Sequence, residues 1–176
     1  MKVKSIKQRI KEHFFLNPTV QLRVRELERT LKLPLPSVIR YCKELEEEEI
    51  LVINKIGNVT FYKASKNEIY LLEKKLYNLK QLYDSGLVPF LKIELSNPVI
   101  VLFGSYAKGE DLENSDIDLY IETPSKKGVH LEKFEKLLQR KIQIFCHKNI
   151  NGITNLHLAN NVLNGIILNN YLEVFR

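Results

Sequence analysis

Residues 98–121, PVIVLFGSYAKGEDLENSDIDLYI, hold the feature that most constrains this chain: an apolar run, a Gly-Ser pair, and two aspartates on the next apolar run. The run PVIVLF is short and rich in β-branched residues, which predicts a buried strand. Gly104 follows it directly, so a ligand can approach the backbone with no Cβ in the way. Ser105 is expected to cap a short helix begun by YAKG. Its hydroxyl would join backbone N–H groups that suit phosphate oxygens.

The two aspartates stand one residue apart in SDIDLYIE. On a strand, Asp116 and Asp118 point to one face, while Ile117 and Leu119 point to the other. Two neighbouring carboxylates repel each other unless a divalent cation holds them. A phosphate-binding turn beside a cation-binding pair is what a magnesium-dependent nucleotide enzyme requires.

The apolar strand, the Gly-Ser turn, the step of eleven residues from Ser105 to Asp116 and the Asp-Ile-Asp strand together resemble the minimal nucleotidyltransferases of the DNA polymerase β superfamily. The resemblance covers about residues 96–150. It implies Mg²⁺-dependent transfer of a nucleoside monophosphate from a nucleoside triphosphate to a hydroxyl, on a small molecule or on a protein such as a partner toxin. The site residues that it implies are nucleotide-binding Gly104, Ser105 and Lys108, and catalytic, metal-binding Asp116 and Asp118.

The chain departs from this family at the third carboxylate, which usually comes from a later strand. In the expected strand KIQIFC, the residue in that register is Gln143. A glutamine amide has no charge and cannot act as a base. Glu94, Glu122 or Glu173 could supply the carboxylate instead. The alternative is a DNA-binding regulator whose second domain binds nucleotide with weak or no catalysis.

The first 64 residues predict three helices followed by a hairpin. Apolar residues recur at helical spacing in 5–16 and again through Val24, Leu27 and Leu31, and Ser37 is expected to cap a third helix that runs to about Glu48. The segments ILVIN and VTFYKA flank a turn at KIGN, which predicts a β-hairpin.

This order of elements resembles the MarR-like winged helix-turn-helix domain. In that domain the third helix enters the major groove of duplex DNA and the hairpin lies along its backbone. The residues that the resemblance places on DNA are Ser37, Arg40, Lys43, Lys55 and Asn58, with Arg23 and Arg25 near phosphates.

The charge is distributed unevenly along the chain, whose formal net charge is +6. Residues 1–64 contain 13 Lys and Arg against 8 Asp and Glu, whereas residues 65–176 contain 14 against 13. A basic segment beside a near-neutral one indicates two domains with different partners. The acidic run at 46–49 would repel phosphate if it faced DNA, and it is expected at the far end of the third helix.

Between these two parts, residues 67–83 predict a helix with an apolar seam at heptad spacing. The seam comprises Ile69, Leu72, Leu76, Leu79 and Tyr83. Two readings stay open, a linker helix packed on its own domains or the seam of a homodimer. The expected fold is α+β, with a winged-helix domain at 1–64, linker helices at 65–95 and a nucleotidyltransferase domain with a mixed sheet at 96–176.

The sequence also argues against some cellular locations. No apolar run approaches the roughly 20 residues of a membrane span, and the basic N-terminal segment lacks the apolar core of a signal peptide. Cys42 and Cys146 have neither a disulfide framework nor zinc spacing, so we expect two reduced, buried thiols. These features predict a cytoplasmic protein with no membrane contact.

Overall fold

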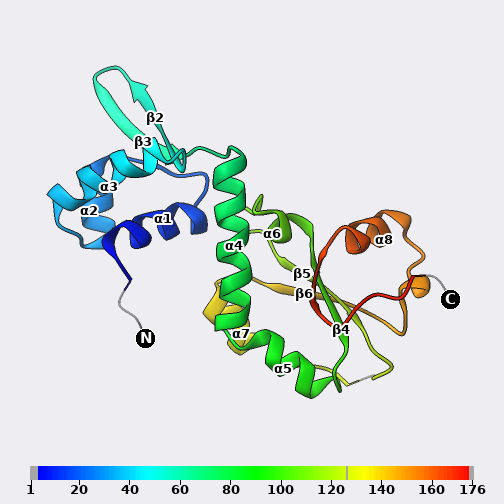
Figure 1. The fold of residues 1–176 in the computed structure, drawn as a ribbon. Coiled ribbons are helices and arrows are strands. Elements are labelled where there is room, and N and C mark those ends of the chain that lie inside the picture. The colour runs from blue at the N-terminus through cyan, green and yellow to red at the C-terminus, as the bar shows by residue number, and fades with distance from the viewer. Residues whose placement is uncertain (1–3, 126, 175–176) are drawn as a thin grey trace. The chain divides into compact units, whose positions relative to one another are not determined.

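The computed structural model describes residues 4–125 and 127–174, and the chain divides into two compact units, Met1–Lys74 and Lys75–Arg176. The division falls within helix α4 (Glu68–Asp84) (Figure 1). The described residues form eight α-helices, none of them long and apolar enough to cross a membrane.

The first unit consists of three helices and a small antiparallel sheet. Its elements are α1 (Ile6–Leu16), β1 (Gln21–Leu22), α2 (Val24–Leu31), α3 (Leu35–Glu47), β2 (Leu51–Ile56) and β3 (Val59–Ala64). The strand order is β1-β3-β2. The helices bury Ile10, Phe14, Leu27, Val38 and Leu45. Three helices and a hairpin are therefore present as expected, and the assignment to the winged-helix class remains a prediction.

Helix α3 begins earlier than the sequence suggested. Its N-cap is Pro34 and a second proline, Pro36, lies in its first turn, so Ser37 is inside the helix and the expected cap is wrong. The physical reason is that the first N–H groups of a helix have no intrahelical partner. A proline there loses no hydrogen bond, and its fixed φ suits the helix.

The second unit is built on a mixed four-stranded sheet. Its strands are β4 (Val99–Phe103), β5 (Ile117–Glu122), β6 (Ile142–His147) and β7 (Ile166–Asn169), in the order β6-β5-β4-β7. The β5–β6 pair is parallel and the other two pairs are antiparallel. The remaining elements are helices α5 (Leu87–Glu94), α6 (Gly104–Lys108), α7 (Glu132–Leu138) and α8 (Leu156–Leu163), and a 3₁₀ turn, η1 (Ile150–Gly152). This mixed α+β architecture agrees with the expected fold class.

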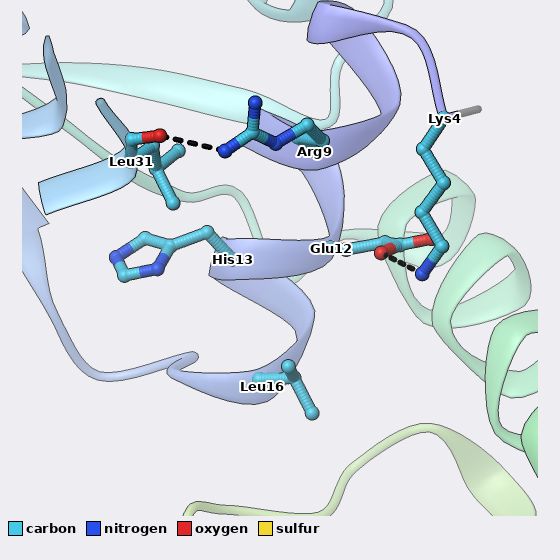
Figure 2. Close-up of a pocket in the computed structure, with 6 residues that line it drawn as sticks. All are labelled: Lys4, Arg9, Glu12, His13, Leu16 and Leu31. Carbon is cyan, nitrogen blue, oxygen red and sulfur yellow. Dashed lines mark hydrogen bonds and ion pairs between the residues drawn. The ribbon is translucent and has the colours of Figure 1, made fainter. Parts of the chain in front are cut away.

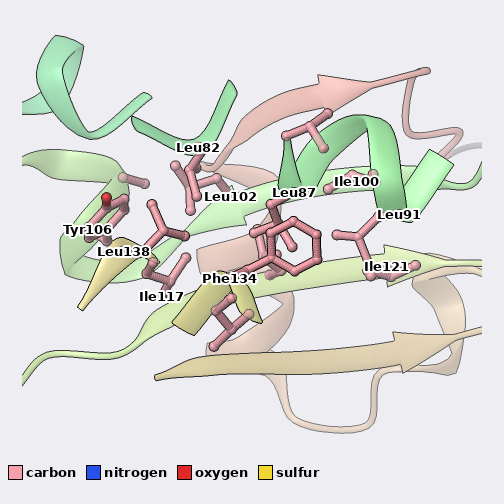
Figure 3. Close-up of a cluster of buried hydrophobic side chains, with 14 of the residues drawn as sticks. Leu82, Leu87, Leu91, Ile100, Leu102, Tyr106, Ile117, Ile121, Phe134 and Leu138 are labelled. Atoms are coloured by element: carbon pink, nitrogen blue, oxygen red, sulfur yellow. The ribbon is translucent and has the colours of Figure 1, made fainter. Parts of the chain in front are cut away.

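Both faces of this sheet are covered by apolar side chains. On one face, Ile100, Leu102, Ile117 and Ile121 pack with residues of α4, α5, α6 and α7, as Figure 3 shows. On the other face, a second cluster joins the sheet to η1 and α8; it comprises Val101, Phe103, Tyr120, Ile150, Ile153 and Val162. Because successive residues of β4 enter opposite clusters, its sequence is continuously apolar, and the prediction of a buried strand is confirmed.

The apolar seam of α4 is largely exposed. The side chains of Ile69, Leu72, Leu76 and Tyr83 are 45–57% exposed, whereas Leu79 packs against the first cluster. This exposure does not exclude a linker helix packed on its own domains, since the Tyr83 hydroxyl donates to the Leu168 carbonyl oxygen at 3.3 Å. The homodimer remains a prediction.

The two cysteines differ in exposure. Cys42 is buried in the first unit, as expected, but Cys146 is exposed, so the expectation of a second buried thiol is wrong. Cys146 lies on β6, an edge strand of the sheet. The sequence of a strand does not by itself say whether the strand is central or at an edge.

Gly165 allows α8 to approach the sheet. A Cβ there would lie 2.6 Å from Val101 Cγ1 and 2.7 Å from the Leu102 carbonyl oxygen. We expect Gly165→Ala to destabilise the protein by about 1–3 kcal/mol, as overpacking does, measured as a loss of unfolding free energy in denaturant. Gly128→Ala is the matched control, because a Cβ at Gly128 meets no atom within 4 Å. Equal stability of the two variants would contradict the expectation.

Candidate nucleotide-binding site

The turn after β4 requires glycine for two separate reasons. Gly104 has φ +75°, in the left-handed region that L side chains avoid. A Cβ there would also collide with Oδ2 of Asp118 and lie 3.3 Å from its Cγ. The carboxyl group of Asp118 therefore packs directly against the backbone of the Gly-Ser turn.

Asp118 is positioned by two neighbouring strands. It pairs with Phe103 across the antiparallel ladder and with Gln143 across the parallel one. Its side chain is half-buried, and burial, followed by the negative charge of Asp116, raises the pKa of Asp118. Asp116 is exposed and comes directly before β5. Sheet pairing thus places the Asp118 carboxylate at the turn, and Asp116, outside the ladder, is near enough for its charge to act on Asp118.

Helix α6 begins at Gly104 with Phe103 at the N-cap, so the expected capping role of Ser105 is wrong. The positive φ of Gly104 lets the chain enter the helix directly, and Ser105 falls in the first turn. The first N–H groups of a helix lack intrahelical partners and suit anions. Lys108 is the last residue of α6, at its opposite end, and its side chain is exposed.

Among the residues that the structure describes, no third carboxylate joins Asp116 and Asp118 in a metal-binding arrangement. Gln143, the register partner of Asp118, is exposed. Glu122 shares the face of Asp118 but pairs with Val99 at the other end of β4, about 13 Å along the strand. Glu94 ends the helix that precedes β4, and Glu173 follows β7. Within residues 4–125 and 127–174, no three His, Cys, Asp or Glu side chains are arranged to hold a metal ion.

The donors at this site nevertheless fit a magnesium ion. Mg²⁺ is usually held by one or two carboxylates, by waters and by the phosphates of a substrate, and not by a cage made only of protein. Asp116 and Asp118 provide two such carboxylates, and the charge of Asp116 already disfavours ionisation of Asp118. A cation between them would relieve that repulsion.

Comparison with known families bears on the same segment. Residues 85–157 match the family model of the nucleotidyltransferase domain. The match contains the Gly-Ser turn and both aspartates, and it does not extend into the first unit. It supports an NTP substrate and a transferase activity. No curated protein and no solved structure matches the chain.

In the first unit, the expected DNA-binding residues of α3 differ in their surroundings. The Arg40 guanidinium stacks 4.3 Å from the Tyr41 ring centroid and lies 3.6 Å from Glu44 Oε1. Glu44 also accepts a hydrogen bond from Lys7. Lys43 is exposed, and Ser37 is half-buried in the first turn. Part of the charge of Arg40 is therefore balanced within the unit.

A second set of basic residues lies between α2 and the hairpin. Three arginines, one glutamate and the turn of the hairpin line a hollow of about 400 Å³; its polar residues are Arg23, Arg25, Glu26, Arg29, Asn58 and Thr60. Arg23 is paired with Glu26, which leaves a net positive charge in the hollow. Asn58 and Lys55 are exposed on the hairpin. Sequence reasoning missed Arg29, whose place beside the hairpin depends on the packing of α2.

A further cavity of about 370 Å³ opens beside α1 (Figure 2). Its charged residues bond within the unit: Arg9 donates to the Leu31 carbonyl at 2.6 Å, and Lys4 pairs with Glu12 at 2.5 Å. Burial lowers the pKa of His13, which therefore favours the neutral form. These contacts account for the cavity's charges without a ligand.

We expect Gly104→Ala to weaken binding of Mg²⁺ and NTP at least about tenfold, because the added Cβ displaces the Asp118 carboxyl. Isothermal calorimetry with each NTP measures it. Gly86→Ala is the matched control: Gly86 has φ +79° in the same unit, yet a Cβ there meets nothing within 4 Å. If both variants lost the same affinity, the effect would come from backbone strain alone.

Proposed function

We propose that the second unit is a Mg²⁺-dependent nucleotidyltransferase that moves a nucleoside monophosphate from an NTP to a hydroxyl acceptor. The observation that supports this most directly is the packing of the Asp118 carboxyl against Gly104. It joins a turn suited to phosphate oxygens to a carboxylate suited to a cation. The family match over residues 85–157 supports the same reading.

In this mechanism the first-turn N–H groups of α6 and the Ser105 hydroxyl hold the triphosphate, and Lys108 contacts an outer phosphate. Asp116 and Asp118 would bind Mg²⁺, which neutralises charge on the phosphates and polarises the α-phosphoryl group. The acceptor oxygen forms a bond to the α-phosphorus, and the bond from that phosphorus to the oxygen bridging to the β-phosphate breaks. Pyrophosphate leaves, and the proton of the hydroxyl passes to a base.

The identity of that base separates the enzyme from its alternative. Gln143 stands in register with Asp118 and cannot accept the proton. The proton would then have to pass to a group of the acceptor molecule or to solvent. Without such a base, turnover would be slow. The alternative function is therefore a DNA-binding regulator that binds nucleotide and transfers it weakly or not at all.

Nucleotide binding should depend on both aspartates and on Mg²⁺. We expect Asp116→Asn or Asp118→Asn, or removal of Mg²⁺ by EDTA, to weaken NTP binding at least about tenfold, because the cation loses a charged ligand. Calorimetry measures this without knowledge of the acceptor. Glu122→Gln, on the same face at the far end of β5, should bind as the wild type does. Wild-type affinity in Asp118→Asn would overturn the proposal.

Transfer itself is tested by pyrophosphate release and by mass spectrometry of co-expressed neighbouring proteins for an added nucleotide mass. A protein acceptor such as a partner toxin would gain that mass. Gln143→Asp adds a carboxylate in register with Asp118 and is included to separate the two functions. If the wild type binds NTP but releases no pyrophosphate, and Gln143→Asp does release it, the result favours the regulator.

We also propose that the first unit binds duplex DNA as a winged helix. The arginine-lined hollow beside the hairpin supports this more strongly than α3 does, since Arg40 is partly balanced by Glu44. Ser37, Lys43, Lys55 and Asn58 would add contacts from α3 and the hairpin. Symmetric DNA sites favour a homodimer, for which the exposed seam of α4 is available. A cytoplasmic location remains part of this proposal.

DNA affinity should fall steeply as salt rises. We expect Arg25→Ala with Arg29→Ala to lower the slope of log affinity against log salt by about 2, as loss of two phosphate contacts would. Fluorescence anisotropy with a labelled duplex between low and physiological salt measures the slope. Lys80→Ala, in the second unit and paired with Asp84, is the control. An unchanged slope in the double variant would show that the arginine-lined hollow does not contact DNA phosphates.

A further inference from the structure

We propose that Asn78, Asp111 and Arg140 position the nucleotide-binding turn and the loop that leads to Asp116. The inference rests on the proposed nucleotidyltransferase function. None of the three residues belongs to the Gly-Ser and Asp-Ile-Asp pattern. They act through the backbone that they hold, so they are positioning residues and do not touch the nucleotide.

All three side chains are withdrawn from solvent. Asn78 is 2% exposed, Asp111 1% and Arg140 9%. The Asn78 amide donates to Asp111 Oδ1 at 2.8 Å and to the Tyr106 carbonyl oxygen at 3.0 Å. On its other side, Arg140 Nη2 lies 3.8 Å from Asp111 Oδ2. Both oxygens of the Asp111 carboxylate are therefore engaged by polar groups from other elements.

The groups that Asn78 holds belong to the two segments that frame the site. Tyr106 lies in α6, whose first residue is Gly104. Asp111 lies in the loop of residues 109–116, which ends at Asp116. An asparagine amide has two N–H donors, and here one goes to each segment. The helix and the loop are thus tied to one point on α4.

Two further bonds of this loop are local. The Glu110 N–H donates to the Ser105 carbonyl at 3.0 Å, and the Leu112 N–H to Ser115 Oγ at 2.9 Å. Such bonds fix individual turns but not the place of the loop against the sheet. Asn78 and Arg140 come from segments remote in sequence, α4 and the connection from α7 to β6, and they supply that placement.

The energetics also indicate positioning. Burying a carboxylate and a guanidinium costs desolvation, and well-packed apolar residues of similar volume are often as stable or more so. A buried polar group is therefore weak evidence for stability alone. In this unit the buried cluster also holds the segments on either side of the site. That matters because the close packing of Asp118 on Gly104 tolerates little displacement. Misplacement of a reacting group by about 1 Å can cost 10²-fold in rate.

The test uses the full chain and the variant Asn78→Leu, which keeps the side-chain volume and removes both donors. We expect the amides of residues 105–116 to exchange hydrogen faster by mass spectrometry. We also expect affinity for Mg²⁺ with NTP to fall at least about tenfold by calorimetry. The matched control is Asn169→Leu. Asn169 lies in the same unit and donates to the Pro98 carbonyl oxygen at 2.5 Å, at the start of β4 and away from Gly104.

A second variant covers the case in which Asn78→Leu does not fold. Asp111→Leu with Arg140→Met replaces the buried ion pair by apolar groups, which is often neutral or stabilising. It also leaves one Asn78 N–H without its acceptor, which lowers stability. We therefore expect a folded variant whose melting temperature is at or somewhat below that of the wild type. A purely structural role predicts unchanged nucleotide affinity in this folded variant, whereas a positioning role predicts the same loss of at least about tenfold.

The outcomes separate this inference from the function on which it rests. Loss of affinity in a folded variant, with the control unchanged, supports positioning. Wild-type affinity and wild-type exchange in a folded variant overturn the inference and leave the proposed function intact. A wild-type protein that binds no NTP in the presence of Mg²⁺ overturns both.

Discussion

The contact between the Asp118 carboxyl group and the Gly104 backbone is the constraint on which the second unit's site depends. The antiparallel pair Phe103–Asp118 fixes the two strands at this point. A residue with a Cβ at position 104 would separate the carboxylate from the turn, and its φ would be strained as well. Gly104 thus meets two requirements, a left-handed backbone conformation and space for the Asp118 carboxyl group. Both put a carboxylate beside the turn that we propose binds phosphate.

This contact is held by a sheet that is buried on both faces. The side chains of β4 alternate between the two apolar clusters, so the strand cannot slip by one residue without exchanging its entire set of packing partners. A fixed register keeps Phe103 opposite Asp118. The strands therefore fix Asp118 and the start of the turn, while Asn78 and Arg140 contact the loop between α6 and β5 through Asp111.

The sequence was most informative where chemistry and backbone geometry coincide. The strand, the turn and the Asp-Ile-Asp segment are local patterns, and the register of Gln143 followed from the spacing of apolar residues in β6. Local rules failed at helix starts: both Ser37 and Ser105 lie inside helices, because Pro36 and Gly104 allow an earlier start. The hydrogen bonds of Asn78 were beyond prediction, since they join segments about 30 residues apart and no periodicity records such a pairing.

The register of Gln143 gives the two proposed functions a common physical basis. Binding a nucleotide requires donors for phosphate and a cation between carboxylates, which the turn, Asp116 and Asp118 can supply. Turnover also requires a base for the acceptor's proton, and an amide cannot provide one. A bound acceptor that brings its own carboxylate to the exposed side of β6 would complete the site. Transfer would then depend on the acceptor, and a unit that only binds nucleotide would become an enzyme when that acceptor is present.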